Sequence, residues 1–507
     1  MSKAPQKSAP ASPKTPEYQA IIVGTGFGGM GAAIQLNRLG ITSILMLDEA
    51  SDVGGTWHHN SYPGIAVDIP SVTYSYSFEP NPYWSRIYAP GRELKAYAHH
   101  VAQKYNLRQY MRFNALVEKS VYDEEGQFWT VSIQGQAPVT ARILILATGF
   151  LSHPKMPDIK GIENFAGKVI HTARWDHTYD LNSKRAAVIG TGATSVQLVP
   201  EIAPKLAQLD VYQRTAIWVS PKNDSKIAKS IQKLFASLPE SQKIARFASS
   251  SVLELMMVTG VLHNKQLSFL NKSIEFMCRA HMRRVIKDPV LREKLTPHYD
   301  FGCKRPTFSN TFYPTFNRKN VELVTTSIDH IEADGIVTQD GVKRKIDTLI
   351  LATGFKVWEK GNFPAFDVIG KSGIELGAWW DDNGFQSYEG LSVPNFPNLF
   401  NLHSPYAYSG FSYFSVVDYQ MAHIERCLGE MIRLDATSFE VNAAANSTFT
   451  DRMKHKLDSS IFTNGNCASA NSYYFNPQGE ATLLRPTTTY NAMHASHTFP
   501  LSDYQFA

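Results

Sequence analysis

Residues 18–29 read Tyr-Gln-Ala-Ile-Ile-Val-Gly-Thr-Gly-Phe-Gly-Gly, a stretch that joins an apolar segment to a glycine motif. Its first six residues have an apolar centre and predict a short strand, after which Gly24, Gly26 and Gly29 follow at the spacing G-x-G-x-x-G. This spacing predicts a tight turn, a close approach of the backbone to a pyrophosphate, and close packing of a helix on the strand. The phosphate would lie at the N-terminus of that helix, which is predicted over residues 30–39.

An acidic residue ends the next predicted strand. The apolar residues 43–47 are followed by Asp48, which lies about 20 residues beyond the glycines, where a carboxylate can hold the hydroxyls of a ribose. A glycine motif on its own is more often a plain loop. Strand, helix, second strand and acid together indicate a dinucleotide site.

A second glycine motif repeats this order. A strand is predicted over 186–189 and a helix over 196–202, and the motif residues between them are Gly190, Gly192, Thr194 and Ser195. Ser195 replaces the third glycine, which predicts slightly looser packing of the helix. After a strand at 209–212, Arg214 stands where an acid would favour NAD, so the predicted cofactor is NADP. The alternatives are a packing turn for the motif and a solvated cation for Arg214.

Composition limits the class of protein. The chain has 507 residues, of which 43% are hydrophobic, so it can bury the cores of two or three domains. The net charge of +5 is carried by dispersed Lys and Arg. Dispersed charge does not indicate a nucleic-acid surface, so no nucleic-acid partner is predicted.

The four cysteines are far apart in the sequence. They are Cys278, Cys303, Cys427 and Cys467. No CxxC or metal-ligand spacing occurs among them, so no metal site is predicted, and their spacing is typical of a reducing cytoplasm. A flavin disulfide reductase would need a redox pair close to the first glycine motif, and the sequence has none there.

Targeting signals and membrane spans are not indicated. Residues 1–16 are rich in Pro, Ser, Ala and Lys, and predict a disordered tail without the apolar centre of a signal peptide. The longest apolar stretch, 247–262, is interrupted by Glu254 and is shorter than a membrane span requires. We predict a cytoplasmic protein without an integral membrane segment. A buried or cleft-lining helix is favoured for this stretch over peripheral membrane contact.

Two segments of similar sequence indicate two similar domains. Residues 141–150 and 347–355 are each an apolar strand that ends in Ala-Thr-Gly-Phe. Residues 222–303 have apolar residues at helical spacing and predict a helical insertion. Beyond Phe355 the sequence is aromatic and loop-rich, and we expect it to complete the first unit. The predicted fold class is therefore α/β, with two doubly wound dinucleotide-binding (Rossmann-like) domains and a helical insertion.

Two further strings resemble a known family. Between the two glycine motifs runs Phe165-x-Gly167-x-x-x-His171-x-x-x-Trp175-Asp176, which resembles the fingerprint of type I Baeyer–Villiger monooxygenases, a group of class B flavoprotein monooxygenases. A second string, Gly54-Gly55-Thr56-Trp57 with Tyr62-Pro63-Gly64 and Asp68, is similar to the family's N-terminal pattern. The likeness continues through Lys304-Arg305, Asn317-Arg318 and Phe396–Phe400, so it covers nearly all of the chain from residue 18.

The resemblance implies FAD and NADPH as cofactors and O2 and a ketone as substrates. In that family NADPH reduces the flavin, O2 adds at C4a, and the peroxyflavin attacks the ketone to give an ester or lactone. The implied domains are a tail at 1–16, an FAD domain at 17–150 and 356–507, an NADP domain at 151–221 and 304–355, and an insertion at 222–303. Five aromatic residues within 403–414 match a segment that lines the substrate site, which implies an apolar ketone; core packing explains them equally well.

Roles for single residues follow from the same resemblance. Arg305 would stabilise the anionic oxygen species, and Asp68 would orient Arg305. Lys304 would join Arg214 around the 2′-phosphate. Gly55, Thr56 and Trp57 would surround the flavin, while His171 and Trp175 would govern movement of the linker between domains. For Arg305 and Asp68 the alternatives are an ordinary ion pair between domains and a turn residue.

The sequence leaves two other functions open and departs from the family pattern at two positions. One alternative is a flavin-containing monooxygenase that oxidises nitrogen or sulfur, and a second is a flavin- and NADP-binding redox protein without catalysis. Tyr473 stands where relatives carry a tryptophan, which puts a nicotinamide contact in question. Ser309 replaces an acid that some relatives have after Arg305.

Overall fold

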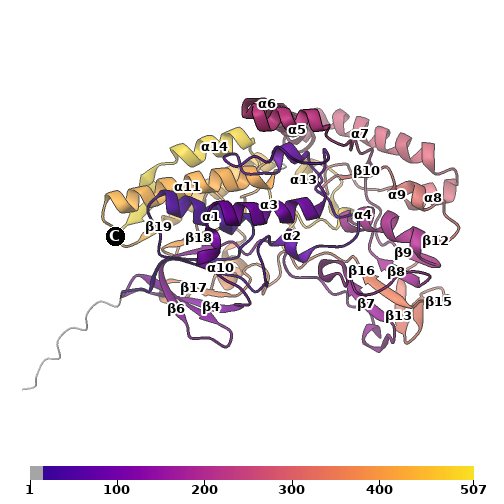
Figure 1. The fold of residues 1–507 in the computed structure, drawn as a ribbon, viewed down its shortest axis with the longest axis horizontal. Coiled ribbons are helices and arrows are strands. Elements are labelled where there is room, and N and C mark those ends of the chain that lie inside the picture. The colour runs from indigo at the N-terminus through magenta and orange to yellow at the C-terminus, as the bar shows by residue number, and fades with distance from the viewer. Residues whose placement is uncertain (1–14, 411) are drawn as a thin grey trace, which may run out of the picture.

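Two sheets of mainly parallel strands form the two halves of the molecule in a computed structural model, which describes residues 15–410 and 412–507 (Figure 1). The predicted α/β class is confirmed. Of the predicted tail, only Thr15 and Pro16 lie within the described residues, where they form no regular element.

The first sheet has the strand order β17-β4-β5-β6-β1-β2-β3, with β18 paired to β6. Its strands are β1 (Tyr18–Val23), β2 (Ile44–Leu47), β3 (Met111–Arg112), β4 (Val117–Asp123), β5 (Phe128–Ile133), β6 (Val139–Leu146), β17 (Asp367–Ile369) and β18 (Leu399–Asn401). The strands β6, β1, β2 and β3 are parallel, whereas β4, β5 and β6 pair antiparallel. Residues 20–22 of the central strand are fully buried, as expected for a parallel strand covered on both faces.

Helices from both ends of the chain cover one face of this sheet. α1 (Phe27–Arg38), α3 (Gly91–Lys104) and α11 (Tyr413–Arg433) share one apolar core with the sheet. The sequence beyond Phe355 was predicted to be loop-rich, and this is wrong in part, because it forms α10 (Leu376–Asn383), α11, α12 (Ala443–Leu457) and α14 (Thr489–Thr498). The buried residues of α11 are mostly aliphatic, and the helix packs against α1.

The second sheet is fully parallel, with the order β12-β9-β8-β16-β7. Its strands are β7 (Lys168–His171), β8 (Arg185–Ile189), β9 (Gln208–Tyr212), β12 (Val321–Val324) and β16 (Thr348–Leu351). α4 (Ala193–Ile202) follows β8, and an antiparallel sheet is formed by β13 (Ile328–Glu332), β14 (Gly335–Thr338) and β15 (Lys343–Lys345). Both predicted glycine motifs thus lie between a parallel strand and a helix, β1–α1 and β8–α4.

The insertion is helical, as predicted, and leaves and rejoins the second half at a pair of short strands. β10 (Val219–Ser220) pairs in parallel with β11 (Thr307–Phe308). Between them lie α5 (Lys229–Ser237), α6 (Pro239–Met257), a π-helical turn η6 (Val258–Leu262), α7 (Asn264–Val285) and α8 (Pro289–Lys294). α5, α6 and α7 run along the top of the molecule in Figure 1. Arg305 lies two residues before β11, so the return of the insertion fixes its position.

The apolar stretch at 247–262 belongs to a longer helix than predicted. α6 and η6 together span Pro239–Leu262, 24 residues, and this is the one helix among the described residues that is long and apolar enough to cross a membrane by length and composition. Only 11% of its most apolar part is buried. The expected buried or cleft-lining helix is therefore confirmed only at its end, where Met256 and Met257 line a pocket, because most of the helix is exposed.

Short elements complete the described fold. They are α2 (Thr56–His59), α9 (Phe312–Thr315), α13 (Ile461–Asn464), β19 (Phe439–Val441), β20 (Tyr504–Phe506), and the 3-10 turns Ser71–Thr73, Leu107–Tyr110, Ile162–Asn164, Thr172–Arg174, Ala203–Lys205, Lys371–Gly373, Ala468–Ala470 and Leu501–Asp503.

Candidate active site

The first glycine turn has the tight geometry that its sequence predicts. Gly24 has φ +111°, and a Cβ there would lie 2.4 Å from the carbonyl oxygen of Ala147. A Cβ on Gly29 would lie 1.9 Å from the oxygen of Gly24, so α1 can approach β1 only without a side chain. α1 begins at Gly26 without a side-chain cap, which leaves backbone N–H groups of its first turn directed at this space. The turn therefore suits a phosphate.

The second turn repeats this arrangement with one difference. Gly190 has φ +106°, and a Cβ there would lie 2.5 Å from the oxygen of Ala352. Ala147 and Ala352 begin the two Ala-Thr-Gly segments, so each echo in the sequence supports one glycine turn. Ser195 is fully buried and its hydroxyl donates to the oxygen of Gly190 at 2.6 Å. This helix therefore accommodates a side chain where α1 cannot. A Cβ on Gly192 would meet no atom within 4 Å.

Asp48 supports the first turn from the end of β2. Its carboxylate accepts hydrogen bonds from the backbone N of Thr25 at 2.6 Å and from the Thr25 hydroxyl at 2.7 Å. The backbone N of Ala50 is a third donor, at 2.9 Å. Asp48 thus fixes the residue between the first two glycines, and its contact with a ribose stays a prediction.

The Gly54-Gly55-Thr56-Trp57 string lies against the first turn. Gly55 has φ +52°, and a Cβ there would lie 3.1 Å from the Cα of Gly26. Thr56 and Trp57 begin α2, and the indole of Trp57 is 9% exposed and donates to the hydroxyl of Tyr74 at 3.2 Å. The string therefore forms one wall of the space at the N-terminus of α1.

Arg214 and Lys304 come together beyond the second turn. Arg214 follows β9, and Lys304 returns from the insertion 90 residues later. Burial, together with the positive charge of Arg214, lowers the pKa of Lys304 to about 8. The Lys304 ammonium also lies 5.3 Å from the ring centroid of Tyr299. Two cations at close range favour an anionic group between them.

Arg305 and Asp68 form a bidentate ion pair across 237 residues of sequence. The Nη2 atom of Arg305 donates to Oδ1 of Asp68 at 2.8 Å, and its Nε donates to Oδ2. The two side chains are 20% and 34% exposed. Burial raises the pKa of Asp68, but the charge and hydrogen bonds of Arg305 outweigh it and leave the pKa below its ordinary value. Arg305 therefore stays charged in a fixed orientation.

Arg305 forms part of the wall of a pocket that is partly open to solvent. Pro306, Tyr408, Tyr474 and Leu484 line it with Arg305. The remaining lining residues come mostly from the insertion: Met256, Met257, Thr259, Gly260, Val261, Asn271, Ile274, Phe301, Gly302 and Gly410. The sequence pointed to 247–262 as a buried or cleft-lining helix but did not place it at Arg305, because only the folding of the insertion brings these residues to the site.

Two tyrosines from the C-terminal part of the chain lie beside Arg305. Tyr408, from the aromatic segment, hydrogen-bonds with Arg305, and burial raises its pKa. Tyr473 stands close enough for its charge to interact with Arg305, and burial raises its pKa to about 12. Its ring centroid is 6.4 Å from that of Phe150, in the first Ala-Thr-Gly-Phe segment. Most other aromatic residues of 403–414 that the structure describes, such as Tyr406 and Phe414, are core residues.

The string from Phe165 to Asp176 lies in the second half of the molecule, where its residues pack and pair with other residues of that half. Phe165 is buried in a core with strands of the second sheet, and a Cβ on Gly167 would lie 2.5 Å from the oxygen of Asp347. Asp176 pairs with Lys168 at 2.6 Å, and Trp175 packs on the core beneath α4.

His171 connects this string to the second Ala-Thr-Gly segment. Its Nδ1 accepts a hydrogen bond from the backbone N of Ala173 at 3.1 Å, and its Nε2 lies 3.4 Å from the hydroxyl of Thr353. Burial, and to a lesser degree the charge of Arg174, lowers its pKa. A neutral imidazole thus links the string to the crossing point between the two halves.

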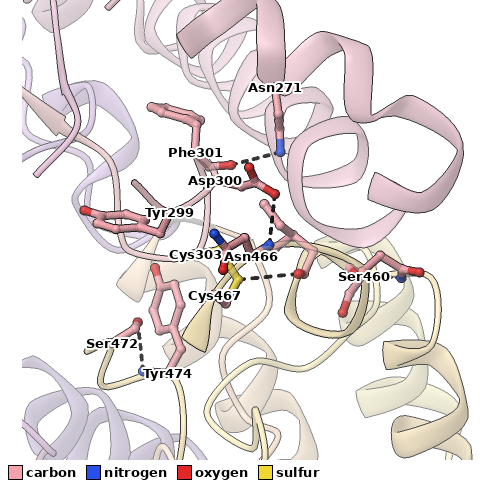
Figure 2. The surroundings of a disulfide bond; sticks show 12 residues. Asn271, Tyr299, Asp300, Phe301, Cys303, Ser460, Asn466, Cys467, Ser472 and Tyr474 are labelled. Carbon is pink, nitrogen blue, oxygen red and sulfur yellow. Dashed lines mark hydrogen bonds between the residues drawn. A yellow bond between two sulfur atoms is a disulfide. The ribbon is translucent and has the colours of Figure 1, made fainter. Parts of the chain in front are cut away.

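A disulfide between Cys303 and Cys467 fixes the segment next to Lys304 and Arg305 (Figure 2). The two cysteines are 164 residues apart in sequence, and their spacing gave no sign of the pair. Beside the disulfide, the backbone N of Asn466 donates to Asp300 at 2.9 Å. The disulfide thereby connects the segment of Tyr473 and Tyr474 to the loop that carries Lys304 and Arg305. Cys278 and Cys427 are buried thiols.

The second departure has a local explanation. Ser309, where some relatives carry an acid, is buried, and its hydroxyl accepts hydrogen bonds from the backbone N atoms of Thr311 and Phe312 at 3.2 and 3.0 Å. It therefore caps the turn that begins α9. Among the described residues no group of three or more His, Cys, Asp or Glu could hold a metal ion.

Known proteins share this architecture. Residues 21–265 match a family described as pyridine nucleotide-disulphide oxidoreductase. A Baeyer–Villiger monooxygenase of Streptomyces coelicolor is 36% identical over 488 residues, which are 96% of this chain and 92% of that protein. The crystal structure of OTEMO in complex with FAD and NADP has a TM-score of 0.85 at 28% identity, over 97% of this chain and 100% of that chain. Oxidised steroid monooxygenase bound to NADP has a TM-score of 0.85 at 29% identity, over 97% and 99%. This protein therefore belongs to the Baeyer–Villiger monooxygenase family.

Proposed function

We propose that this protein is an NADPH- and O2-dependent FAD monooxygenase that inserts one oxygen atom next to the carbonyl group of a ketone to give an ester or lactone. The observation that carries the proposal is the bidentate pair of Arg305 and Asp68 in the wall of the pocket. The two glycine turns support it, because both lack side chains where a pyrophosphate would approach.

The residues present fit both cofactors. FAD would lie at the turn formed by Gly24, Gly26 and Gly29, with Asp48 nearby and Gly55, Thr56 and Trp57 as its wall. NADPH would lie at Gly190, Gly192, Thr194 and Ser195, with its 2′-phosphate between Arg214 and Lys304. When bound, FAD supplies the oxygen-activating chemistry and NADPH its reducing equivalents.

Arg305, held in place by Asp68, would stabilise negative charge that develops on the substrate. A ketone carbonyl oxygen gains negative charge when its carbon is attacked, and the fixed guanidinium stabilises that charge. Asp68 is a positioning residue, since it holds the plane of the guanidinium by two hydrogen bonds. An uncharged partner would leave the fork free to turn.

We further propose an apolar ketone, the domain boundaries given by the sequence, and a cytoplasmic site of action. Met257, Val261, Ile274 and Leu484 in the pocket wall support an apolar substrate. The strands of the first sheet come from residues 18–146 and 367–401, which supports two separate segments for the FAD domain. The proposed dependence on NADPH supports the cytoplasm. The cysteines do not, because Cys303 and Cys467 form a disulfide although their spacing is typical of a reducing compartment.

Product analysis tests the function. Purified FAD-loaded enzyme with NADPH and O2 is given a panel of cyclic, long-chain and aryl ketones, and in parallel a thioether. We expect an ester or lactone from at least one ketone, because the charge of Arg305 stabilises a carbonyl-derived anion. Sulfoxide formation without ester from any ketone would contradict the proposal and favour oxidation of nitrogen or sulfur.

The lowered pKa of Lys304 predicts a pH-dependent preference for NADPH. Its ammonium is charged below its pKa of about 8 and loses the charge as the pH rises through that value. The kcat/KM for NADPH should therefore fall above about pH 8 relative to that for NADH, by up to about tenfold for one lost contact to a charged group. Initial rates with both coenzymes between pH 7 and pH 9.5 measure the effect, with those limits set roughly one to two units either side of the pKa.

Lys304→Arg serves as the matched control for this profile. An arginine keeps its charge over the whole range, so the ratio of the two coenzymes should become independent of pH. If the wild-type ratio is already flat, Lys304 does not contact the 2′-phosphate.

A further inference from the structure

The helices of the insertion present a broad apolar surface to solvent. On α5, α6, α7 and the joint between α5 and α6, ten large apolar side chains are at least 44% exposed. They define the outer helical face: Ile231, Leu234, Leu238, Ile244, Phe247, Val252, Leu255, Phe269, Phe276 and Met277. Phe247 and Phe276 are 75% and 69% exposed. Exposed apolar surface of this extent marks a binding site for a protein or a membrane.

The opposite side of α6 is bound to the body of the protein. Gln242 is buried and donates to the oxygen of Asn81 at 2.7 Å. Arg246 donates to the oxygen of Ser75 at 2.7 Å and forms an ion pair with Asp418 at 3.6 Å. α6 therefore lies flat on the molecule. It can enter the surface of a bilayer with its outer side but cannot cross it while these contacts hold.

Helical spacing places the apolar residues of each helix on one side. Ile244, Phe247 and Leu255 recur at spacings of 3 and 8 residues on α6, and Phe269 and Phe276 are seven apart on α7. These intervals bring the side chains to the same side of a helix with 3.6 residues per turn.

Positive charge surrounds the outer helical face. Residues 222–303 contain 14 Lys and Arg and 7 Asp and Glu, a net charge of +7, whereas the whole chain carries +5. The basic residues that are exposed on α5, α6 and α7 are Lys229, Lys233, Lys243, Lys265, Lys272, Arg283 and Arg284. Charge that is dispersed along the sequence is thus concentrated in this part of the fold.

We propose that the outer helical face binds the surface of an anionic phospholipid bilayer. Apolar side chains would enter the boundary between headgroups and acyl chains, and the surrounding Lys and Arg would contact the phosphates. The charge favours an anionic lipid surface over a second copy of this chain, because two faces of net positive charge repel each other.

The pocket beside Arg305 adjoins this face. α6 continues from the exposed Leu255 directly into Met256 and Met257, which line the pocket. If the proposed function holds, an apolar ketone dissolved in the membrane would reach Arg305 without crossing bulk water. Membrane binding itself does not depend on that function.

Vesicle sedimentation tests the proposal on the full-length, FAD-loaded protein. Phosphatidylcholine vesicles are compared with vesicles that also contain phosphatidylglycerol. We expect binding to the mixed vesicles to be at least about tenfold tighter and to weaken at high ionic strength, because both the apolar and the basic residues contribute. Equal and negligible sedimentation with both kinds of vesicle would overturn the proposal.

Three paired variants identify the surface responsible. Phe247→Ser with Phe276→Ser should weaken binding to mixed vesicles by about tenfold or more. Lys265→Glu with Arg283→Glu should weaken it to the level of pure phosphatidylcholine. The matched control, Val342→Ser with Ile432→Ser, removes two side chains that are 44% and 54% exposed elsewhere and should change nothing.

Two further measurements separate the other outcomes. Turnover of a water-soluble ketone, or NADPH-driven flavin reduction if no ketone is turned over, should be unchanged in all three pairs, which shows that they fold. Light scattering reports the oligomeric state. A dimer that Phe247→Ser with Phe276→Ser dissociates, without vesicle binding by the wild type, would assign this face to a second copy of the chain and overturn the proposal.

Discussion

Arg305→Ala is expected to lower the rate of ester formation by about 100- to 1,000-fold, while NADPH still reduces the flavin. The magnitude corresponds to the loss of one group that stabilises a developing oxyanion. Flavin reduction precedes the steps that need this charge, so its rate should change little. Stopped-flow absorbance of the flavin under anaerobic conditions measures the reduction, and gas chromatography measures the ester.

Arg305→Ala also affects Asp68, so Arg305→Lys serves as its control. Without Arg305 the carboxylate loses the partner that lowers its pKa, and a half-buried charge is left without compensation. Arg305→Lys keeps a positive charge but cannot form the two-point contact, so its ester rate should lie between those of the wild type and Arg305→Ala. Ester formation at the wild-type rate in Arg305→Ala would remove Arg305 from the mechanism.

Arg214→Ala should raise the KM for NADPH by roughly 10- to 100-fold, because a hydrogen bond to a charged group contributes about 1.5 to 3 kcal/mol. The KM for NADH, which has no 2′-phosphate, should stay nearly constant. The same change removes a positive charge beside Lys304 that lowers its pKa, so that pKa should rise above about 8. Initial rates over a range of both coenzymes measure the two constants.

Arg92→Ala is the matched control, since it removes an exposed arginine on α3, in the first half of the molecule. Its KM for NADPH should equal that of the wild type. Equal increases for NADPH and NADH in Arg214→Ala would show that the residue supports the fold of the site and does not select the phosphate.

Much of the local structure could be predicted from the sequence. The first strand was predicted at 18–23 and is β1 (Tyr18–Val23), and the strand predicted at 209–212 is β9 (Gln208–Tyr212). The predicted helices at 30–39 and 196–202 both begin three residues earlier, at Phe27 and Ala193. Glycine turns show clearly in a sequence, because positive φ and missing side chains restrict the residue type.

Only the family resemblance predicted from the sequence that Arg305 and Asp68 act together. Composition and spacing place nothing near Arg305, and the sequence separation of 237 residues between it and Asp68 spans the whole second glycine motif. The structure brings the two together, and also adds Tyr408, Tyr473 and the residues of α6 and η6.

Three features could not be predicted from the sequence, because each depends on which distant segments come into contact in the folded chain. The segment beyond Phe355 forms the helix α11, Cys303 pairs with a cysteine 164 residues away, and the apolar face of α6 is exposed. Periodicity shows that a helix has an apolar side, but it does not show whether another element covers that side.

The family, the two glycine turns and the α/β class could be read from the amino-acid sequence, because steric limits on glycine and the alternation of strands and helices act over short stretches of chain. The folded structure added the two-point contact of Asp68 with Arg305, the lowered pKa of Lys304 beside Arg214, and the charged, apolar surface of the insertion beside the pocket. Such contacts depend on electrostatics and packing between distant segments, and these interactions exist only once the chain has folded.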